Sequence, residues 1–130
     1  MKGERFLIEK KIGSGYTSEV FKAVSSRGEA LCVKVIHSHF YANQLGKELA
    51  NNETAILERL DHPNILKFHK KEARDKLIIV TEYCPEGTLY DYLCRKRTLS
   101  QEEALKMVQG VVRGCEYLMG EGVVHRDLKP

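Results

Sequence analysis

The chain lacks several patterns that would each define a class of protein. No apolar run approaches the length of a membrane span, and the N-terminus has no uninterrupted apolar segment like that of a secretion signal. The formal net charge is only +3, which is too small to indicate a nucleic-acid or membrane partner. No internal repeat or low-complexity segment is visible. We therefore expect a soluble, cytoplasmic protein that binds neither nucleic acid nor membrane.

Cysteine pairs with metal-binding or redox spacing are also missing. The four cysteines, Cys32, Cys84, Cys94 and Cys115, lie far apart, and no two of them form a C-x-x-C pair. Three of them lie inside apolar runs, so we expect small buried or half-buried side chains in a reducing compartment. The sequence predicts no metal site.

What the chain does contain is the composition of an ordinary globular domain, with 42% hydrophobic and 30% charged residues in 130 positions. A chain of this length can bury roughly two-thirds of the surface that it exposes when unfolded, so a hydrophobic core is possible. In the first part, apolar and polar residues alternate over short runs bounded by glycine or charged turns, which is typical of β-strands. These runs are residues 5–15, 18–25, 30–36, 65–73 and 76–83.

Two kinds of helix are expected, one between the strands and others after them. The first covers Gly46–Leu60 and ends before Pro63, with an apolar stripe of Leu49, Ile56, Leu57 and Leu60. After residue 85, Leu89, Tyr92 and Leu93 indicate a short helix. Ser100 and Glu103 then form a capping box that begins a longer helix. Its stripe consists of Leu105, Val108, Val112, Cys115 and either Leu118 or Met119.

Gly110 and Gly114 lie inside this longer helix, where each costs on the order of 1 kcal/mol relative to alanine. Either they allow close packing against another element, or they are a tolerated weakness. Strands with one helix, followed only by helices, predict an α+β fold with a sheet-rich first part and a helical second part.

Lys34 and Glu53 are charged residues at apolar positions. Lys34 lies within the strand-like run "ALCVKVI", and Glu53 falls within the apolar stripe of the first helix. An unpaired charge that faces a core costs several kcal/mol, but a lysine and a glutamate facing the same interior can pair. We therefore expect a buried Lys34–Glu53 pair. The alternative for each residue alone is a charged end group that reaches water.

A glycine-rich turn precedes these charges, in "IGSGYTSEVFKA" from Ile12 to Ala23. Glycines between two strands suit a tight backbone that approaches a phosphate closely with its amide groups. The helix-opening G-x-G-x-x-G of dinucleotide folds does not apply, because a strand follows, and the G-K-[ST] ending of a P-loop is absent.

These features together resemble the protein-kinase signature set. A glycine-rich hairpin, a strand lysine, a helix glutamate, "HPNI", "VTEY" and "HRDLKP" follow one another in the order of that family. The resemblance extends from Phe6 to Pro130. It implies a small lobe over residues 1–84, with an antiparallel twisted sheet and one helix. Residues 85–130 would then contain the first helices of the large lobe, and the chain stops at the catalytic loop.

The resemblance implies a nucleotide role for each matching residue of the small lobe. Ile12, Gly13, Ser14 and Gly15 would lie over the phosphates of ATP, and Val20 would pack above the adenine. Lys34, paired with Glu53, would hold the α- and β-phosphates. Two positions depart from the family pattern. Ser18 replaces the third glycine and adds a side chain near the phosphates, and Cys32 replaces an alanine that packs on adenine.

Further residues would complete the site. Thr81 resembles the gatekeeper at the back of the adenine pocket, and Glu82 and Cys84 would offer the backbone carbonyl and amide that read the adenine edge. Thr88 and Asp91 stand where the ribose is usually met.

In "HRDLKP", Asp127 resembles the catalytic aspartate that accepts the substrate hydroxyl proton, and Lys129 would steady the γ-phosphate. The "LKP" ending resembles serine/threonine kinases. His125 is expected to be a packed structural residue.

The sequence contains no D-F-G motif and no asparagine after Asp127 that could bind magnesium. Because phosphoryl transfer in this family depends on magnesium ions, we expect these 130 residues alone not to turn over. The alternative to an incomplete serine/threonine kinase is a non-catalytic fragment that binds nucleotide or a partner protein. A partner could cover the apolar face of residues 101–119, and protein substrate would bind through the large-lobe segments that are not in this sequence.

Overall fold

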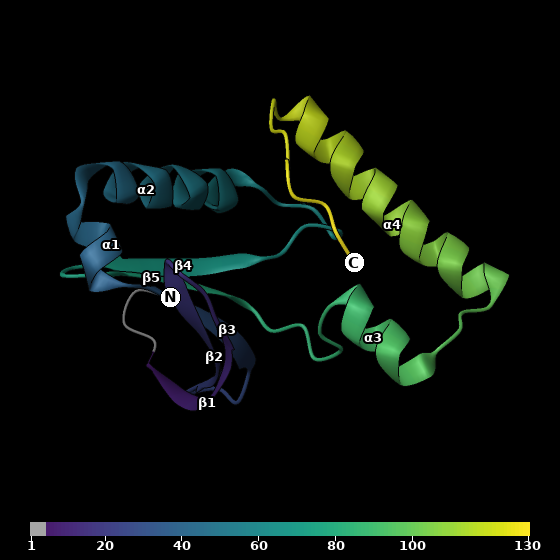
Figure 1. Cartoon of the computed structure of the whole chain (residues 1–130), viewed down its shortest axis with the longest axis horizontal. Coiled ribbons are helices and arrows are strands. Elements are labelled where there is room, and N and C mark those ends of the chain that lie inside the picture. The colour runs from purple at the N-terminus through teal and green to yellow at the C-terminus, as the bar shows by residue number, and fades with distance from the viewer. Residues whose placement is uncertain (1–4) are drawn as a thin grey trace. The chain divides into compact units, whose positions relative to one another are not determined.

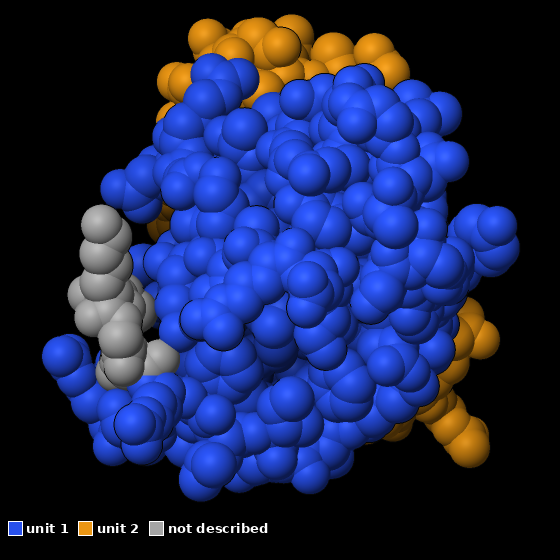
Figure 2. Space-filling model, turned by 90° about the vertical axis from the view of Figure 1, so that its left-hand side faces the viewer, with its two compact units in different colours: residues 1–61, 66–83 blue, residues 62–65, 84–130 orange. Residues whose placement is uncertain are grey.

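A computed structural model describes residues 5–130, which form a five-stranded sheet and four helices. The chain divides into two compact units (Figures 1 and 2). The first unit contains the residues up to 61 together with 66–83, and the second contains residues 62–65 and 84–130. The α+β class predicted from the sequence is confirmed.

The sheet belongs to the first unit. Its strands are β1 (Phe6–Ser14), β2 (Ser18–Ser25), β3 (Ala30–Ile36), β4 (Phe68–Ala73) and β5 (Leu77–Glu82). They lie in the order β1-β2-β3-β5-β4, and every neighbouring pair is antiparallel. Each of the five predicted runs therefore forms a strand.

Two helices follow β3, α1 (Ser38–Ala42) and α2 (Gln44–Arg59), and α2 lies along the sheet in Figure 1. The sequence did not predict α1, which is only five residues long and too short for an apolar period. A cluster of buried residues joins the helices to one face of the sheet: Ile36, Tyr41, Ala50, Leu77 and Ile79. The opposite face has its own cluster of Ala23, Leu31, Val33 and Val80.

The buried face of α2 differs from the predicted stripe. Its buried residues are the small ones, Gly46, Ala50 and Thr54, whereas Leu49 is 54% and Ile56 37% exposed. Small side chains let the helix backbone come close, so the stripe of large residues predicted for this helix was wrong at these two positions.

Gly46 fixes the corner between α1 and α2. A Cβ at this position would lie 2.2 Å from the backbone oxygen of Phe40, a distance that no side chain can occupy. The side chain of Asn43 accepts hydrogen bonds from the backbone N–H groups of Leu45 and Gly46, which caps α2. The corner and the cap together set where α2 begins.

The second unit contains α3 (Leu89–Lys96) and α4 (Gln101–Gly120). The capping box predicted for α4 is present, since the Ser100 side chain accepts from the Glu103 N–H and the Glu103 carboxylate accepts from the Ser100 N–H. The helix ends in a Schellman motif at Gly122, which has a φ of 71°. The Val123 N–H donates to the Leu118 oxygen at 2.8 Å, and the Gly122 N–H donates to the Met119 oxygen at 3.1 Å.

The two glycines inside α4 are explained by residues 62–65, which belong to the same unit. A Cβ on Gly114 would lie 3.0 Å from the Asn64 carbonyl oxygen, and one on Gly110 would lie 3.2 Å from Asn64 Nδ2. The ring of His62 stacks on Tyr117 with 4.8 Å between centroids. Close packing is therefore the reason for both glycines.

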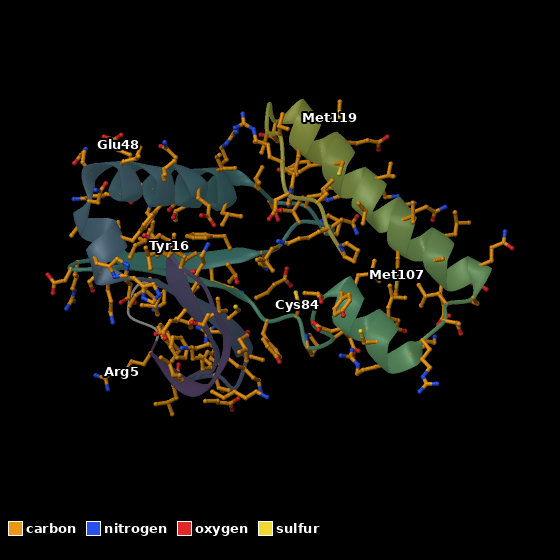
Figure 3. The ribbon with its side chains drawn as sticks, viewed as in Figure 1. Arg5, Tyr16, Glu48, Cys84, Met107 and Met119 are labelled. Atoms are coloured by element: carbon orange, nitrogen blue, oxygen red, sulfur yellow. The ribbon has the colours of Figure 1, made fainter. Side chains whose placement is uncertain are left out.

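Part of the apolar stripe predicted for α4 remains exposed, whereas Cys115 is half-buried and Leu118 is buried. Leu105, Val108 and Val112 are each about half exposed, and Met119 is 75% exposed. Figure 3 shows Met107 on the side of α4 that faces α3 and Met119 near the end of the helix. Large exposed apolar surfaces of this kind commonly mark interaction sites.

Among residues 5–130, no helix is both long and apolar enough to cross a membrane. Cys32 and Cys115 are half-buried, as expected, whereas Cys84 and Cys94 are exposed. The expectation covered three of the four cysteines and therefore holds for only two of them. Cys84 lies between β5 and α3, and the short helix α3, which contains Cys94, buries none of its residues fully.

Candidate functional site

The glycine-rich turn joins β1 to β2. Gly13 pairs with Val20 across the hairpin, and the Gly15 N–H donates to the Ser18 oxygen at 2.8 Å. Neither glycine has a positive φ. A Cβ at Gly13 would meet only Val20 at 3.5 Å, and one at Gly15 would meet only the Ser18 oxygen at 3.9 Å. Packing within the chain therefore does not require glycine at either position, and the turn is left bare of side chains there.

Ser18 and Ile12 lie differently around this turn. Ser18 is buried, with 8% exposure, opposite the buried Ile36 of β3. The side chain that replaces the third glycine is thus packed within the chain, and its expected position near the phosphates stays a prediction. Ile12 is 43% exposed, and Ser14 is exposed at the end of β1.

Strand register brings the predicted small-lobe residues to one face of the sheet. Gly13, Val20, Lys34 and Ile79 form one row of partners across β1, β2, β3 and β5. In the next row, Cys32 pairs with Thr81. Because directly paired residues in a sheet project to the same side, these side chains share one face.

Lys34 Nζ donates to Glu53 Oε1 at 2.8 Å, which links β3 to α2. The predicted pairing is confirmed, but its predicted burial is wrong, because the Lys34 side chain is 32% and the Glu53 side chain 51% exposed. Glu53 lies beside the buried face of α2, next to Thr54, and not on it. A pair this exposed contributes roughly 1 kcal/mol or less to stability, so stability alone is a weak reason for a lysine in the middle of β3.

Thr81 and Glu82 form the end of β5. Thr81 is 6% exposed, and its hydroxyl donates to the Glu82 carbonyl at 3.2 Å. The Glu82 N–H donates to the Lys67 oxygen at 2.9 Å, and Glu82 Oε1 accepts from the Lys67 N–H at 2.7 Å. The Glu82 side chain thus anchors this strand end to the residue that precedes β4, a role that no pattern in the sequence indicated.

Lys22 and Tyr83 lie near the same strand end. Lys22 Nζ bonds to Glu9 Oε2 at 2.7 Å and lies 5.5 Å from the centroid of the Tyr83 ring. The hydrogen bond that Lys22 donates to Glu9 raises the pKa of Lys22 above its usual range. This cation–π contact was also not predicted.

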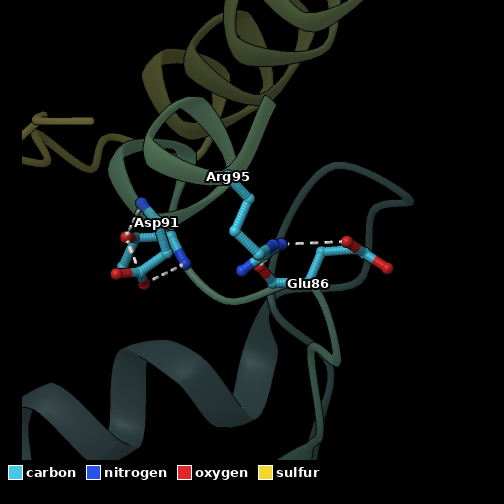
Figure 4. A network of polar contacts seen from close by, with 4 residues as sticks. Glu86, Asp91 and Arg95 are labelled. Carbon is cyan, nitrogen blue, oxygen red and sulfur yellow. Dashed lines mark hydrogen bonds and ion pairs between the residues drawn. The ribbon is translucent and has the colours of Figure 1, made fainter. Parts of the chain in front are cut away.

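In the second unit, Thr88 and Asp91 are hydrogen-bonded to each other (Figure 4). The Thr88 N–H and hydroxyl both donate to Asp91 Oδ2, at 3.0 and 2.6 Å, and the Asp91 N–H donates to Thr88 Oγ1 at 3.1 Å. The hydrogen bond from the Thr88 hydroxyl, followed by that from its N–H, lowers the pKa of Asp91. Both residues therefore cap α3, a role that the sequence analysis did not assign to them.

The guanidinium group of Arg95 binds Glu86, two residues before the cap residue Thr88. Arg95 Nη2 contacts the Glu86 backbone oxygen at 2.7 Å and Glu86 Oε2 at 3.0 Å. Cys84 is exposed at the start of this unit, and its carbonyl accepts from the Gly87 N–H at 3.3 Å.

Asp127 and Lys129 lie at the end of the chain as an exposed ion pair. Lys129 Nζ is 3.3 Å from Asp127 Oδ2, and both side chains are more than 70% exposed. His125 is exposed as well, and its Nδ1 accepts from the Asp127 N–H at 3.2 Å. The expectation that His125 is packed was wrong in these 130 residues, because no described element covers the segment after α4.

A hollow of about 510 Å³ lies within the second unit, between the start of α3 and α4. Its lining residues are Asn64, Glu86, Gly87, Thr88, Leu89, Tyr92, Lys106, Met107, Gly110 and Val111. The sequence analysis did not predict it. For metal ions, the described part of the chain contains no group of three or more His, Cys, Asp or Glu side chains that could hold one.

Comparison with known protein families identifies the family of this chain. The model of the protein kinase domain matches residues 6–130. The chain belongs to the protein kinase family, and its sheet with α2 is the N-lobe-like part of that fold.

Individual relatives agree with this assignment. The chain is 32% identical over 127 residues to mouse NUAK family SNF1-like kinase 1 and 34% identical over 122 residues to calcium-dependent protein kinase 5 of Plasmodium falciparum. It is 33% identical over 125 residues to a probable myosin light chain kinase of Dictyostelium discoideum. These matches cover 96%, 92% and 95% of this chain but only 19%, 21% and 39% of the relatives. The chain thus spans about a fifth of the first two relatives.

Proposed function

We propose that this chain is the ATP-binding part of a protein kinase that transfers the γ-phosphate of ATP to serine and threonine hydroxyls of proteins. Residues 1–84 would be the small lobe, and residues 85–130 the beginning of the large lobe. The observation that carries the proposal is the row Gly13–Val20–Lys34, in which the lysine is also paired with Glu53 on α2.

The residues on this face of the sheet are suited to binding a nucleoside triphosphate. Gly13 and Gly15 leave the turn bare although no residue within the described range 5–130 needs the space, which suits a ligand that approaches the backbone closely. Lys34 supplies a positive charge on the same face, and Glu53 holds its ammonium group in place. Cys32 and Thr81, paired in the adjacent row, would line the adenine. Glu82 and Cys84 would offer backbone groups to the adenine edge, and Thr88 and Asp91 would lie near the ribose.

The chemical step would use the end of the chain. Asp127 would accept the proton of the attacking hydroxyl, and Lys129 would neutralise charge on the γ-phosphate; both are exposed enough to reach a substrate. Magnesium would supply positive charge that neutralises the phosphates during transfer, and none of the residues assigned in this sequence would hold it. Since D-F-G is not among these 130 residues, we expect a polypeptide limited to them to bind ATP without turnover.

A second candidate function is a non-catalytic module that binds a partner protein. The exposed apolar residues of α4, which include Leu105, Val108 and Met119, favour it, because such a surface is suited to burial against another chain. The two functions differ in whether phosphate is transferred by the protein at its natural length.

Transfer of radiolabelled γ-phosphate to a mixed protein substrate, followed by phosphoamino-acid analysis, tests the proposal on the protein at its natural length. We expect phosphoserine and phosphothreonine. Asp127→Asn should abolish transfer but leave ATP affinity within about twofold, because the aspartate acts on the hydroxyl and does not hold the nucleotide. Transfer that persists undiminished in this variant, or label on tyrosine alone, would contradict the assignment.

A further inference from the structure

We propose that His37 is a positioning residue that clamps the glycine-rich turn and thereby aims the amide of Tyr16 at the phosphates of a bound nucleotide. This inference rests on the proposed function and assigns it a residue outside the kinase motifs named above. His37 directly follows β3, three residues after Lys34.

The turn is not one of the favoured two-residue hairpin turns. Gly15 and Ser18 close a loop of two residues, Tyr16 and Thr17, through the bond from the Gly15 N–H to the Ser18 oxygen. Two-residue hairpin loops are favoured as type I′ or II′ turns, which require a positive φ at one or both loop residues. Neither Tyr16 nor Thr17 has a positive φ. Contacts from outside the hairpin therefore contribute to fixing its shape.

His37 supplies that support with two contacts. Its backbone N–H donates to the Thr17 carbonyl at 2.8 Å, and its ring Nε2 lies 3.3 Å from the Gly15 carbonyl. A carbonyl oxygen can only accept, so the second contact requires the proton on Nε2. His37 thus holds the carbonyl that enters the loop, that of Gly15, and the carbonyl of the last loop residue, Thr17.

Fixing the Gly15 carbonyl also fixes an amide. In a planar trans peptide the carbonyl of one residue and the N–H of the next point in opposite directions. When the Gly15 oxygen points to His37, the Tyr16 N–H therefore points away from it. Tyr16 is 86% exposed, so this part of the turn is open to a ligand. An amide with a fixed direction binds a phosphate oxygen without the cost of ordering the loop.

The side chain of His37 is not needed to start α1. His37 is the N-cap of that helix, and its carbonyl accepts from the N–H groups of Phe40 and Tyr41 at 3.0 and 2.9 Å. Its ring makes no capping hydrogen bond and instead lies between the turn and the ring of His39, with 5.3 Å between the two centroids. The His37 carbonyl accepts the first hydrogen bonds of α1, and the His37 ring contacts the turn. A substitution that changes only the side chain therefore affects the turn and leaves the start of α1 in place.

The test compares the affinities of magnesium-ATP and of adenosine for the protein at its natural length, measured by calorimetry. His37→Leu removes the donor and keeps similar bulk, while His37→Gln keeps an N–H that can reach the Gly15 carbonyl. His39→Leu is the matched control, since His39 stacks on His37 and contacts the turn through no described hydrogen bond. We expect His37→Leu to bind ATP about three- to tenfold more weakly, which is the loss of one hydrogen bond. Adenosine affinity should be unchanged, and His37→Gln and His39→Leu should resemble the wild type.

An equal loss for ATP and adenosine, or no loss for either, would overturn the role of His37. A wild type that binds neither ligand would instead overturn the proposed function, so the two failures are distinguishable. If His37→Leu unfolds, the ¹⁵N chemical shifts of the His37 ring in the wild-type protein decide the matter. A proton on Nε2 at neutral pH supports the hydrogen bond from His37 to the Gly15 carbonyl, and an Nε2 without a proton contradicts it.

Discussion

The backbone carbonyl oxygen of Asn64 lies 3.0 Å from the position that a Cβ on Gly114 would occupy. The loop between α2 and β4 therefore meets α4 at backbone distance, within the second unit. Backbone atoms cannot move aside as the end of a long side chain can, so this contact constrains α4 more strongly than that at Gly110, where the neighbour is the amide group of the Asn64 side chain.

Gly114→Ala should destabilise the protein by about 1–3 kcal/mol, because the overpacking outweighs the gain in helix propensity. Gly110→Ala should cost less, since a side chain can shift. Gly120→Ala is the control: no atom of the part of the chain that the structure describes lies within 4 Å of its Cβ position, so we expect a neutral change or a gain of up to about 1 kcal/mol. Urea denaturation measures all three, and equal effects at Gly114 and Gly120 would refute the contact.

Gly46→Ala should disrupt the corner between α1 and α2, because the added Cβ would fall 2.2 Å from the Phe40 oxygen. Since Glu53 lies two turns further along α2, a shift of the helix start should also disturb the Lys34–Glu53 pair. We expect lower thermal stability together with weaker ATP binding. Leu45→Ala, at an adjacent residue that is 64% exposed, should change neither quantity appreciably. A Gly46→Ala protein with wild-type stability would show that the corner is adaptable.

The cap of α4 should make stability depend on pH in the acid range. A hydrogen bond from Lys96, followed by those from the Ser100 N–H and hydroxyl, lowers the pKa of Glu103 from 4.5 to about 2. Because the pKa is lower in the folded state, the carboxylate stabilises the fold fully above pH 4.5, and this contribution is lost as the pH falls toward 2.

Glu103→Gln isolates this effect, because glutamine can also serve in a capping box but carries no charge. The stability difference between wild type and variant, from denaturation midpoints, should be constant above pH 4.5 and shrink from there to pH 2. A difference that stays constant across that interval would mean that Glu103 does not carry the pH dependence.

The sequence predicted the order of elements well because it depends on local patterns. Alternation located the strands, and Ser100 with Glu103 located the start of α4. The buried face of α2 was not predictable in the same way, because it consists of the small residues Gly46, Ala50 and Thr54. These residues let the helix backbone pack closely, and they form no stripe of large apolar side chains.

The parts of the candidate site that depend on the spacing of residues along the sequence were predictable. The parts that depend on contacts between distant residues were not. Lys34 and Glu53 were paired correctly, but the half-exposed position of Glu53 follows from the way in which α2 lies on the sheet. The contacts of His37 with the turn involve residues about 20 positions apart, and no local pattern announces them. Thr88 and Asp91 show the opposite case, because a T-x-x-D spacing is itself a capping signal that the sequence analysis did not use.

Cys32 offers a check on the adenine position. It pairs with Thr81 on the proposed nucleotide face and is half-buried, whereas Cys94 is exposed on α3. Saturating ATP should slow the alkylation of Cys32 by a maleimide several-fold and leave Cys94 unaffected, because a bound ligand shields only the groups that it covers. Peptide mass spectrometry distinguishes the two sites, and equal rates at Cys32 with and without ATP would place the nucleotide elsewhere.

The most direct test of the central claim compares two lysines that pair with α2 in the same way. Lys34 Nζ reaches Glu53 and Lys71 Nζ reaches Glu58, each at 2.8 Å and with both partners partly exposed. Only Lys34 lies in the row with Gly13 and Val20. Calorimetric titration with magnesium-ATP should show a loss of about tenfold or more for Lys34→Met, while Lys71→Met stays within about twofold of the wild type. Equal affinities for the two variants would contradict nucleotide binding at this face.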